Sequence, residues 1–138
     1  MRSKNQKKLP LNRSDFKSII EDDNYFIDKS MLIHHLVNGN NDIVLFPRPR
    51  RFGKTCNLSM IRYFFEKTDP SNANLFNGLA IQNQETWQLQ GKFPVIFLSL
   101  RTCSGLNWQS CFTLITHLLS IEFRRHLYLL NSDVLDSI

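Results

Sequence analysis

Hydrophobic positions divide the chain into stretches with helical periodicity and short uninterrupted apolar runs. The helical spacing predicts helices over residues 14–20, 31–37, 56–65, 84–90 and 107–130. The apolar runs at 43–46 and 94–100 are typical of strands, and the second is apolar enough to be buried on both faces. Two strands separated by helices predict an α/β layered domain with a parallel sheet and right-handed crossovers.

Polar residues mark where several of these elements begin and end. Asn12 or Ser14 is expected to cap the first helix, which a polar turn at residues 21–24 ends. The segment Asn38-Gly39-Asn40 is expected to stop the second helix. Near the end of the chain, Ser132 and the acids after it resemble the start of another helix.

A candidate phosphate-binding loop lies between the first predicted strand and the helix after it. The full pattern is G-x-x-x-x-G-K-[ST], and here Arg48 followed by Pro49 holds the place of the first glycine. The order of strand, loop and helix is nonetheless the required one, since it directs backbone N–H groups and the positive end of a helix dipole at one anion. Lys54 would then reach the β and γ phosphates, and the Thr55 hydroxyl would bind Mg²⁺. The predicted nucleotide-binding residues are Arg48, Pro49, Arg50, Arg51, Phe52, Gly53, Lys54, Thr55 and Cys56.

The arginines of this loop have two interpretations. They could add positive charge to a triphosphate, because guanidinium groups pair well with phosphate oxygens. Alternatively, they could pair with Asp28 or Glu66. Both interpretations stay open for Arg48 and Arg50, whereas we expect a structural role for Arg51.

Composition places the chain among ordinary globular proteins. It has 138 residues, 42% of them hydrophobic, and a net charge of +5. The positive excess lies in the N-terminal region, so residues 1–8 are predicted to be a basic, disordered tail and residues 9–138 part of one domain. As an alternative, the tail contacts a nucleic-acid backbone.

Two further observations concern where in the cell the protein is expected to be found. No apolar run approaches the ~20 residues of a membrane span, and the basic start has no apolar segment of a secretory signal behind it. The three cysteines fit no zinc spacing, which favours reduced thiols. We therefore expect a soluble, cytoplasmic protein without a membrane partner.

Several motifs resemble, in order and spacing, the N-terminal pattern of one family, the AAA-ATPase-like domain of bacterial proteins, which is related to P-loop NTPases. They are Leu9-Pro10, Asp15-Phe16, the segment from Tyr25 to Ser30, the loop from Arg48 to Thr55 with Leu58-Ser59-Met60, Leu75 to Leu79, and Phe93 to Ile96. In that family an arginine usually opens the loop, so Arg48 is expected there. The resemblance implies ATP with Mg²⁺ as the ligand and a Walker A motif at the loop. Many members also carry a restriction-endonuclease-like nuclease domain, and nothing in this sequence corresponds to it.

Hydrolysis needs an acidic residue at the end of a buried strand to hold Mg²⁺. The predicted strand at 94–100 ends before Arg101, and Asp133 follows residues that are predicted to be helical. The resemblance implies that the acidic strand lies beyond Ile138, so we expect a domain truncated before it. No catalytic residue is therefore assigned, and we expect nucleotide binding without hydrolysis by this chain alone.

Two other functions remain open from the sequence. The first is a nucleic-acid-binding module that uses the basic tail and the cluster from Arg48 to Lys54. The second is a non-functional remnant of a longer ATPase, whose uncovered faces would favour self-association or a missing half of the domain.

Overall fold

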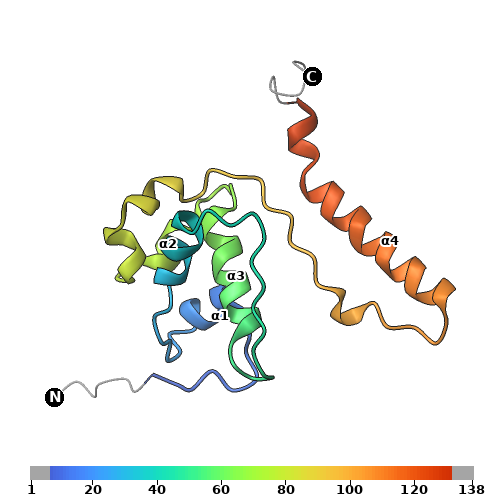
Figure 1. Cartoon of the computed structure of the whole chain (residues 1–138), viewed down its shortest axis with the longest axis horizontal. Coiled ribbons are helices and arrows are strands. Elements are labelled where there is room, and N and C mark those ends of the chain that lie inside the picture. Colours follow the sequence, from blue (N-terminus) through green and yellow to red (C-terminus); the bar gives the residue numbers. More distant parts are fainter. Residues whose placement is uncertain (1–6, 132–138) are drawn as a thin grey trace. The chain divides into compact units, whose positions relative to one another are not determined.

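The structure is a computed structural model that describes residues 7–131. These residues fall into two compact units, one up to Val95 and the other from Ile96. The first unit contains α1 (Phe16–Glu21), α2 (Met31–Asn38), α3 (Lys54–Phe65), η1 (Asn72–Phe76), η2 (Ala80–Asn83) and η3 (Glu85–Leu89), where η denotes a 3₁₀ helix (Figure 1). The second unit contains η4 (Leu100–Thr102), α4 (Trp108–Arg125) and η5 (Leu127–Asn131).

The core of the first unit forms around α3. Met60 and Phe64 of this helix are completely buried. The Phe64 ring packs edge-on against Phe76 at 5.4 Å and Trp87 at 5.9 Å between ring centroids. Phe16 of α1 lies 5.1 Å from Phe76 on the same cluster. Aromatic side chains from three separate elements thus fix the position of α3.

The cap of α1 differs from the sequence prediction. The Asp15 carboxylate, not Asn12 or Ser14, accepts the hydrogen bond from the Ser18 amide, at 3.0 Å. The helix begins at Phe16, two residues later than the pattern suggested, so Asp15 occupies the capping position.

Polar contacts at the start of α1 attach it to α3. The Phe16 amide donates a buried hydrogen bond of 2.9 Å to the Ser59 hydroxyl, which itself donates to the Cys56 carbonyl. The Tyr63 hydroxyl donates to the Asp15 carboxylate at 3.1 Å. The first turn of α1 is therefore bonded to two positions along α3.

The predicted P-loop NTPase-like layered fold, with parallel strands between helices, is wrong for the residues described. These residues contain no strand of a sheet. Isolated parallel bridges join Lys8 to Asn24 and Glu66 to Phe93. The first unit is instead a cluster of α-helices and 3₁₀ helices. The acidic strand expected after residue 138 would therefore have no sheet among residues 7–131 to join.

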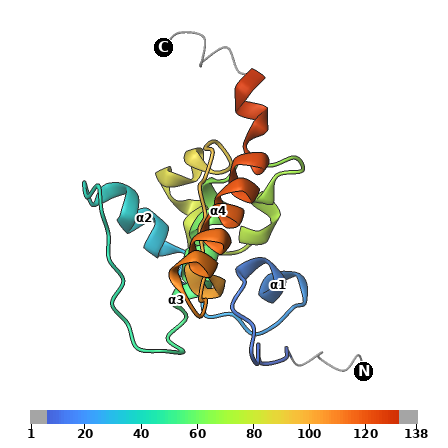
Figure 2. The ribbon, with the colours of Figure 1, turned by 90° about the vertical axis from the view of Figure 1, so that its right-hand side faces the viewer.

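The two apolar runs expected to form strands belong to no sheet. Among the described residues 7–131, no residue of 43–46 or 94–100 is assigned to a strand. Ile43 is 89% exposed, and Ile96, which was expected to be buried, is 72% exposed. A β-prone composition does not make a strand by itself, because the backbone N–H and C=O groups need a neighbouring strand. Figures 1 and 2 show the connection from α2 to α3 as a long loop without helix or strand.

Most of the predicted helices are present in the structure. The second predicted helix is α2, which ends at Asn38 with Gly39 as its C-cap, and the segment expected at 84–90 contains the short 3₁₀ helix η3. The helix after the candidate loop is α3. The helix start predicted at Ser132 lies outside the described residues.

The second unit is built on the long helix that the apolar stripe predicted. The Asn107 side chain caps α4 by accepting a hydrogen bond of 2.9 Å from the Ser110 amide. The Glu122 carboxylate ties the preceding segment to the helix, because it accepts a 2.8 Å bond from the Phe97 amide. No residue of α4 is buried. Within residues 7–131, no helix combines the length and the hydropathy needed to cross a membrane.

Candidate functional site: the loop before α3

The candidate loop turns sharply into α3. Gly53 has φ +73° and ψ 16°, in the left-handed region, and Arg51 has φ +68°. Glycine adopts this conformation without the strain that a Cβ introduces, which explains its place directly before the helix. The Gly53 carbonyl accepts the first helical bond, 2.9 Å from the Asn57 amide. The first amides of α3 have no acceptor within the helix and are free to bind an anion.

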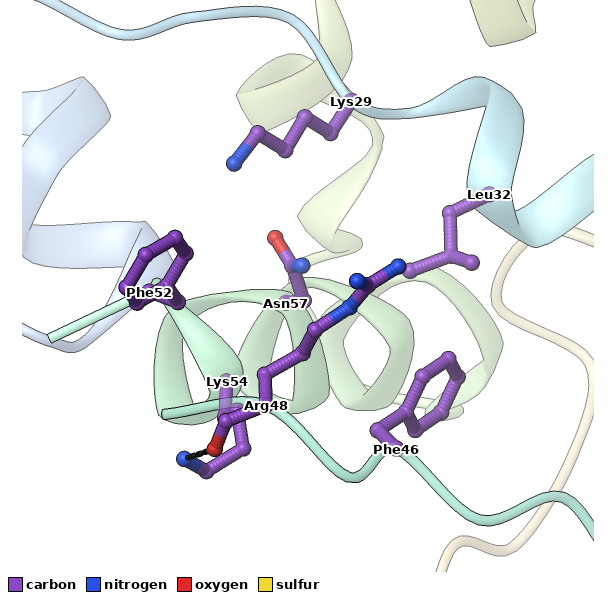
Figure 3. A pocket seen from close by; sticks show the side chains of 7 residues that line it. All are labelled: Lys29, Leu32, Phe46, Arg48, Phe52, Lys54 and Asn57. Atoms are coloured by element: carbon purple, nitrogen blue, oxygen red, sulfur yellow. Dashed lines mark hydrogen bonds between the residues drawn. The ribbon is translucent and has the colours of Figure 1, made fainter. Parts of the chain in front are cut away.

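Lys54, the first residue of α3, folds back over the loop. Its ammonium donates a hydrogen bond to the Arg48 carbonyl (Figure 3) and a second one, of 2.8 Å, to the Pro49 carbonyl. Pro49 cannot supply an amide to a ligand, but its carbonyl serves here as an acceptor. The side chain therefore closes residues 48–54 into a ring at the start of the helix.

A cavity of about 370 Å³ lies beside this ring. Its lining combines three cationic side chains, Lys29, Arg48 and Lys54, with apolar groups and an amide. The lining residues are Lys29, Leu32, Phe46, Arg48, Phe52, Lys54 and Asn57. None of them is acidic, so the cavity favours a negatively charged ligand. Figure 3 shows Lys29 and Arg48 approaching from different segments, with Asn57 between them.

The predicted site residues separate into two groups. Arg48, Phe52 and Lys54 line the cavity. The others form the rest of the loop and the first turn of α3 without lining the cavity: Pro49, Arg50, Arg51, Gly53, Thr55 and Cys56. Thr55 follows Lys54 in the first turn of α3 and is exposed to solvent.

The carboxylates proposed as partners for the arginines are engaged elsewhere. Glu66 forms an ion pair with Arg62, with 2.9 Å between Oε2 and Nε. Asp28 accepts hydrogen bonds from backbone amides. Among the described residues, neither Arg48 nor Arg50 forms an ion pair with these two acids.

Cys56 lies half-buried in the first turn of α3. Burial raises the pKa of its thiol, the Asp15 charge raises it further, and Lys29 offsets part of this. The thiol is therefore protonated near neutral pH and is a weak nucleophile. Its contribution to the site is packing.

Sequence reasoning did not find four of the lining residues, Lys29, Leu32, Phe46 and Asn57. Asp28 entered the sequence analysis only as a partner for the arginines, and Lys29 only within the Tyr25 to Ser30 motif. In the structure, Asp28 accepts the Ser30 amide, whereas Lys29 lines the cavity. The sequence did contain one signal for Lys29, because this lysine lies within the Tyr25 to Ser30 motif just before the helix that begins at Met31.

Asp28 connects the segment before α2 to η2. Its carboxylate accepts hydrogen bonds of 2.8 Å from the Ser30 amide and 2.8 Å from the Ala80 amide. Burial raises the pKa of Asp28, but the Ala80 and Ser30 hydrogen bonds outweigh it and hold the pKa below 3.8. The carboxylate is thus charged at neutral pH.

The basic N-terminal region meets an acidic turn at residues 21–23. The ion pairs are Lys7 with Asp23 at 2.9 Å, Arg13 with Asp22, and Lys17 with Glu21 at 3.7 Å. Lys8 bridges to Asn24, and its carbonyl accepts the Tyr25 amide at 2.8 Å. These acids lower the local positive potential on which the nucleic-acid alternative depends. The rest of the predicted tail, residues 1–6, lies outside the described residues.

Comparison with known proteins confirms the family resemblance. A family model described as "Predicted AAA-ATPase" matches residues 10–133. The chain is 34% identical over 95 residues to the "Uncharacterized protein in vnfD 5'region" of Azotobacter chroococcum mcd 1. That alignment covers 68% of this chain but only 17% of the relative. No solved structure matches. Because the family model covers nearly the whole sequence, the chain belongs to the AAA-ATPase-like family.

Proposed function

We propose that this chain binds a nucleotide, ATP with Mg²⁺, through the variant phosphate-binding loop at residues 48–55. One observation carries the proposal: the Lys54 ammonium and the open end of α3 meet beside a cavity with cationic lining and no acid. Family membership supports the same ligand class.

The chemistry of the loop suits a phosphate chain. The first amides of α3 and the helix dipole favour an anion at the Gly53 turn. Lys54 would move from the loop carbonyls to the phosphate oxygens, since an ammonium prefers a charged acceptor. The cavity volume also falls within the range of about 300–1,000 Å³ typical of small-ligand sites.

The residues present fit Mg²⁺ as a companion of the nucleotide. The exposed Thr55 hydroxyl follows Lys54 in the first turn of α3, where it can reach an ion held by phosphate oxygens. The ion would neutralise charge on the β and γ phosphates.

The test is binding of a labelled ATP analogue in the presence of Mg²⁺. We expect Lys54→Ala to weaken binding by about tenfold or more, because a charge-assisted hydrogen bond contributes roughly 1.5–3 kcal/mol. Lys92→Ala is the matched control: the exposed Lys92 follows Gly91, whose amide bonds the Phe64 carbonyl near the far end of α3. Wild-type affinity in Lys54→Ala would refute the proposal.

We further propose that residues 1–138 alone do not turn ATP over. None of the residues lining the cavity is a carboxylate that could hold Mg²⁺ or orient a water molecule. Phosphate release should therefore stay at the background rate. A steady rate that Lys54→Ala abolishes would contradict this expectation.

A further inference from the structure

We propose that Lys29 supplies a second ammonium to the phosphate chain, from outside the loop. This inference rests on the proposed nucleotide binding and extends it to a residue that no part of the loop motif contains. Through Lys29, the segment before α2 would contact the phosphates of the ligand.

The position of Lys29 is the first support. Its Nζ lies 3.9 Å from the point that a Cβ on Gly53 would occupy. The ammonium therefore stands next to the left-handed turn at which the amides of α3 become available. Lys29 and Lys54 line the same cavity although 25 residues separate them in the sequence. Figure 3 shows the Lys29 side chain extending over the first turn of α3.

The backbone of Lys29 is fixed on both sides. The Asp28 carboxylate binds the Ala80 and Ser30 amides, each at 2.8 Å. The fully buried Ser30 accepts a hydrogen bond of 3.1 Å from the Ile81 amide through its hydroxyl. Two consecutive residues of η2 thus hold the residues that flank Lys29. A long flexible side chain projecting from a fixed backbone samples a limited volume, which includes the cavity.

The charge of Lys29 is not matched by an acid. Within residues 7–131 its ammonium forms no ion pair, and Asp28 directs both carboxylate oxygens to backbone amides. The same ammonium lowers the pKa of Cys56, so its field reaches the first turn of α3. Lys29, Arg48 and Lys54 place three positive charges around one cavity, and a phosphate chain would relieve their mutual repulsion.

The experiment measures binding of Mg²⁺ with ATP and of inorganic tripolyphosphate to wild type, Lys29→Ala, Lys29→Arg, Lys54→Ala and Lys92→Ala. Tripolyphosphate isolates contacts to the phosphates from contacts to the base and sugar. We expect Lys29→Ala to weaken both ligands by about tenfold, because one charge-assisted hydrogen bond is lost. Lys29→Arg should recover most of the affinity, and Lys92→Ala should match wild type.

The fold of each variant is checked by thermal unfolding. The Lys29 side chain is exposed, so the unfolding midpoint of Lys29→Ala should equal that of wild type. If that variant is unfolded, Lys29→Gln keeps most of the side-chain length without the charge and takes its place.

The outcomes separate the two proposals. If Lys54→Ala weakens binding and a folded Lys29→Ala does not, the role of Lys29 is refuted and the nucleotide site stands. If wild type binds tripolyphosphate through Lys29 but does not bind ATP, nucleotide binding is refuted and the phosphate contact of Lys29 stands. If wild type binds neither ligand, both are refuted.

Discussion

Helices α3 and α4 carry similar amphipathic patterns but differ in what surrounds them. Met60 and Phe64 of α3 are fully buried among aromatic rings from α1, η1 and η3. On α4, Trp108 is 72% exposed and Phe123 is 74% exposed, and no residue is buried. An apolar stripe predicts that a helix forms, but it does not supply the elements that bury the stripe.

The difference bears on the site. Because α3 packs against η1 and is hydrogen-bonded to the start of α1, its position relative to these elements is fixed. Functional side chains are positioned more precisely by well-packed helices and strands than by loops. The candidate loop therefore leads into a helix that is anchored in the core of the first unit. Four experiments compare the two helices, from the largest expected effect to the smallest.

Phe64→Ala should have the largest effect. Removing a buried phenyl ring loses apolar burial and leaves a cavity beside Phe76 and Trp87, for a loss of about 3–5 kcal/mol. Urea denaturation of the full chain measures this change. A loss below about 1 kcal/mol would mean that the aromatic cluster does not hold α3.

Ser59→Ala should come next. The substitution leaves the buried Phe16 amide without its acceptor at the α1–α3 contact, which costs about 1–3 kcal/mol. Hydrogen exchange of the Phe16 amide gives a local readout, and faster exchange is expected. Unchanged exchange and stability would show that α1 does not depend on this bond.

Acidification should weaken the second unit at Glu122. Burial raises the pKa of this carboxyl, but the Phe97 amide and Arg125 outweigh it and hold the pKa below 4.5. A lowered folded pKa adds stability above the unfolded pKa, which is lost as pH falls below about 4.5 through the folded value. We expect a loss of about 1 kcal/mol, seen as faster hydrogen exchange at Phe97. Glu122→Gln should remove the pH dependence, and its persistence would assign it to another group.

Phe112→Ala should have the smallest effect. This residue lies on the apolar stripe of α4 but is half-exposed beside Trp108. Little burial is lost, so we expect a change of about 0.5 kcal/mol or less. Urea denaturation under the same conditions as for Phe64→Ala gives the direct comparison. A loss near that of Phe64→Ala would mean that α4 is covered as tightly as α3.

The helices were predictable because their signals are local. The spacing of Met60 and Phe64 predicted α3, and the Asn38-Gly39-Asn40 segment predicted where α2 ends. The order of Gly53 and Lys54 likewise predicted that the loop leads into the start of a helix. Each of these inferences needs only contacts within a few turns of chain.

The errors concern contacts between distant segments. Val44 and Leu98 belong to runs with the composition of buried strands, but pairing depends on a neighbour that composition does not specify. Lys29 was not identified as a site residue, because its approach to Gly53 depends on Asp28 binding Ala80, 52 residues away. Hydrophobic spacing does not reveal such a contact, and the only signal for Lys29 was its place in the Tyr25 to Ser30 motif.

The hydrogen bonds from Lys54 to the Arg48 and Pro49 carbonyls have a consequence for measured affinity. An arriving phosphate must displace acceptors that already occupy two of the three N–H groups of this ammonium. Binding is therefore an exchange of partners, and the loop backbone is a built-in competitor of the ligand. The affinity reports the difference between two sets of hydrogen bonds, so a substitution that reshapes residues 48–49 could tighten binding without touching the ligand.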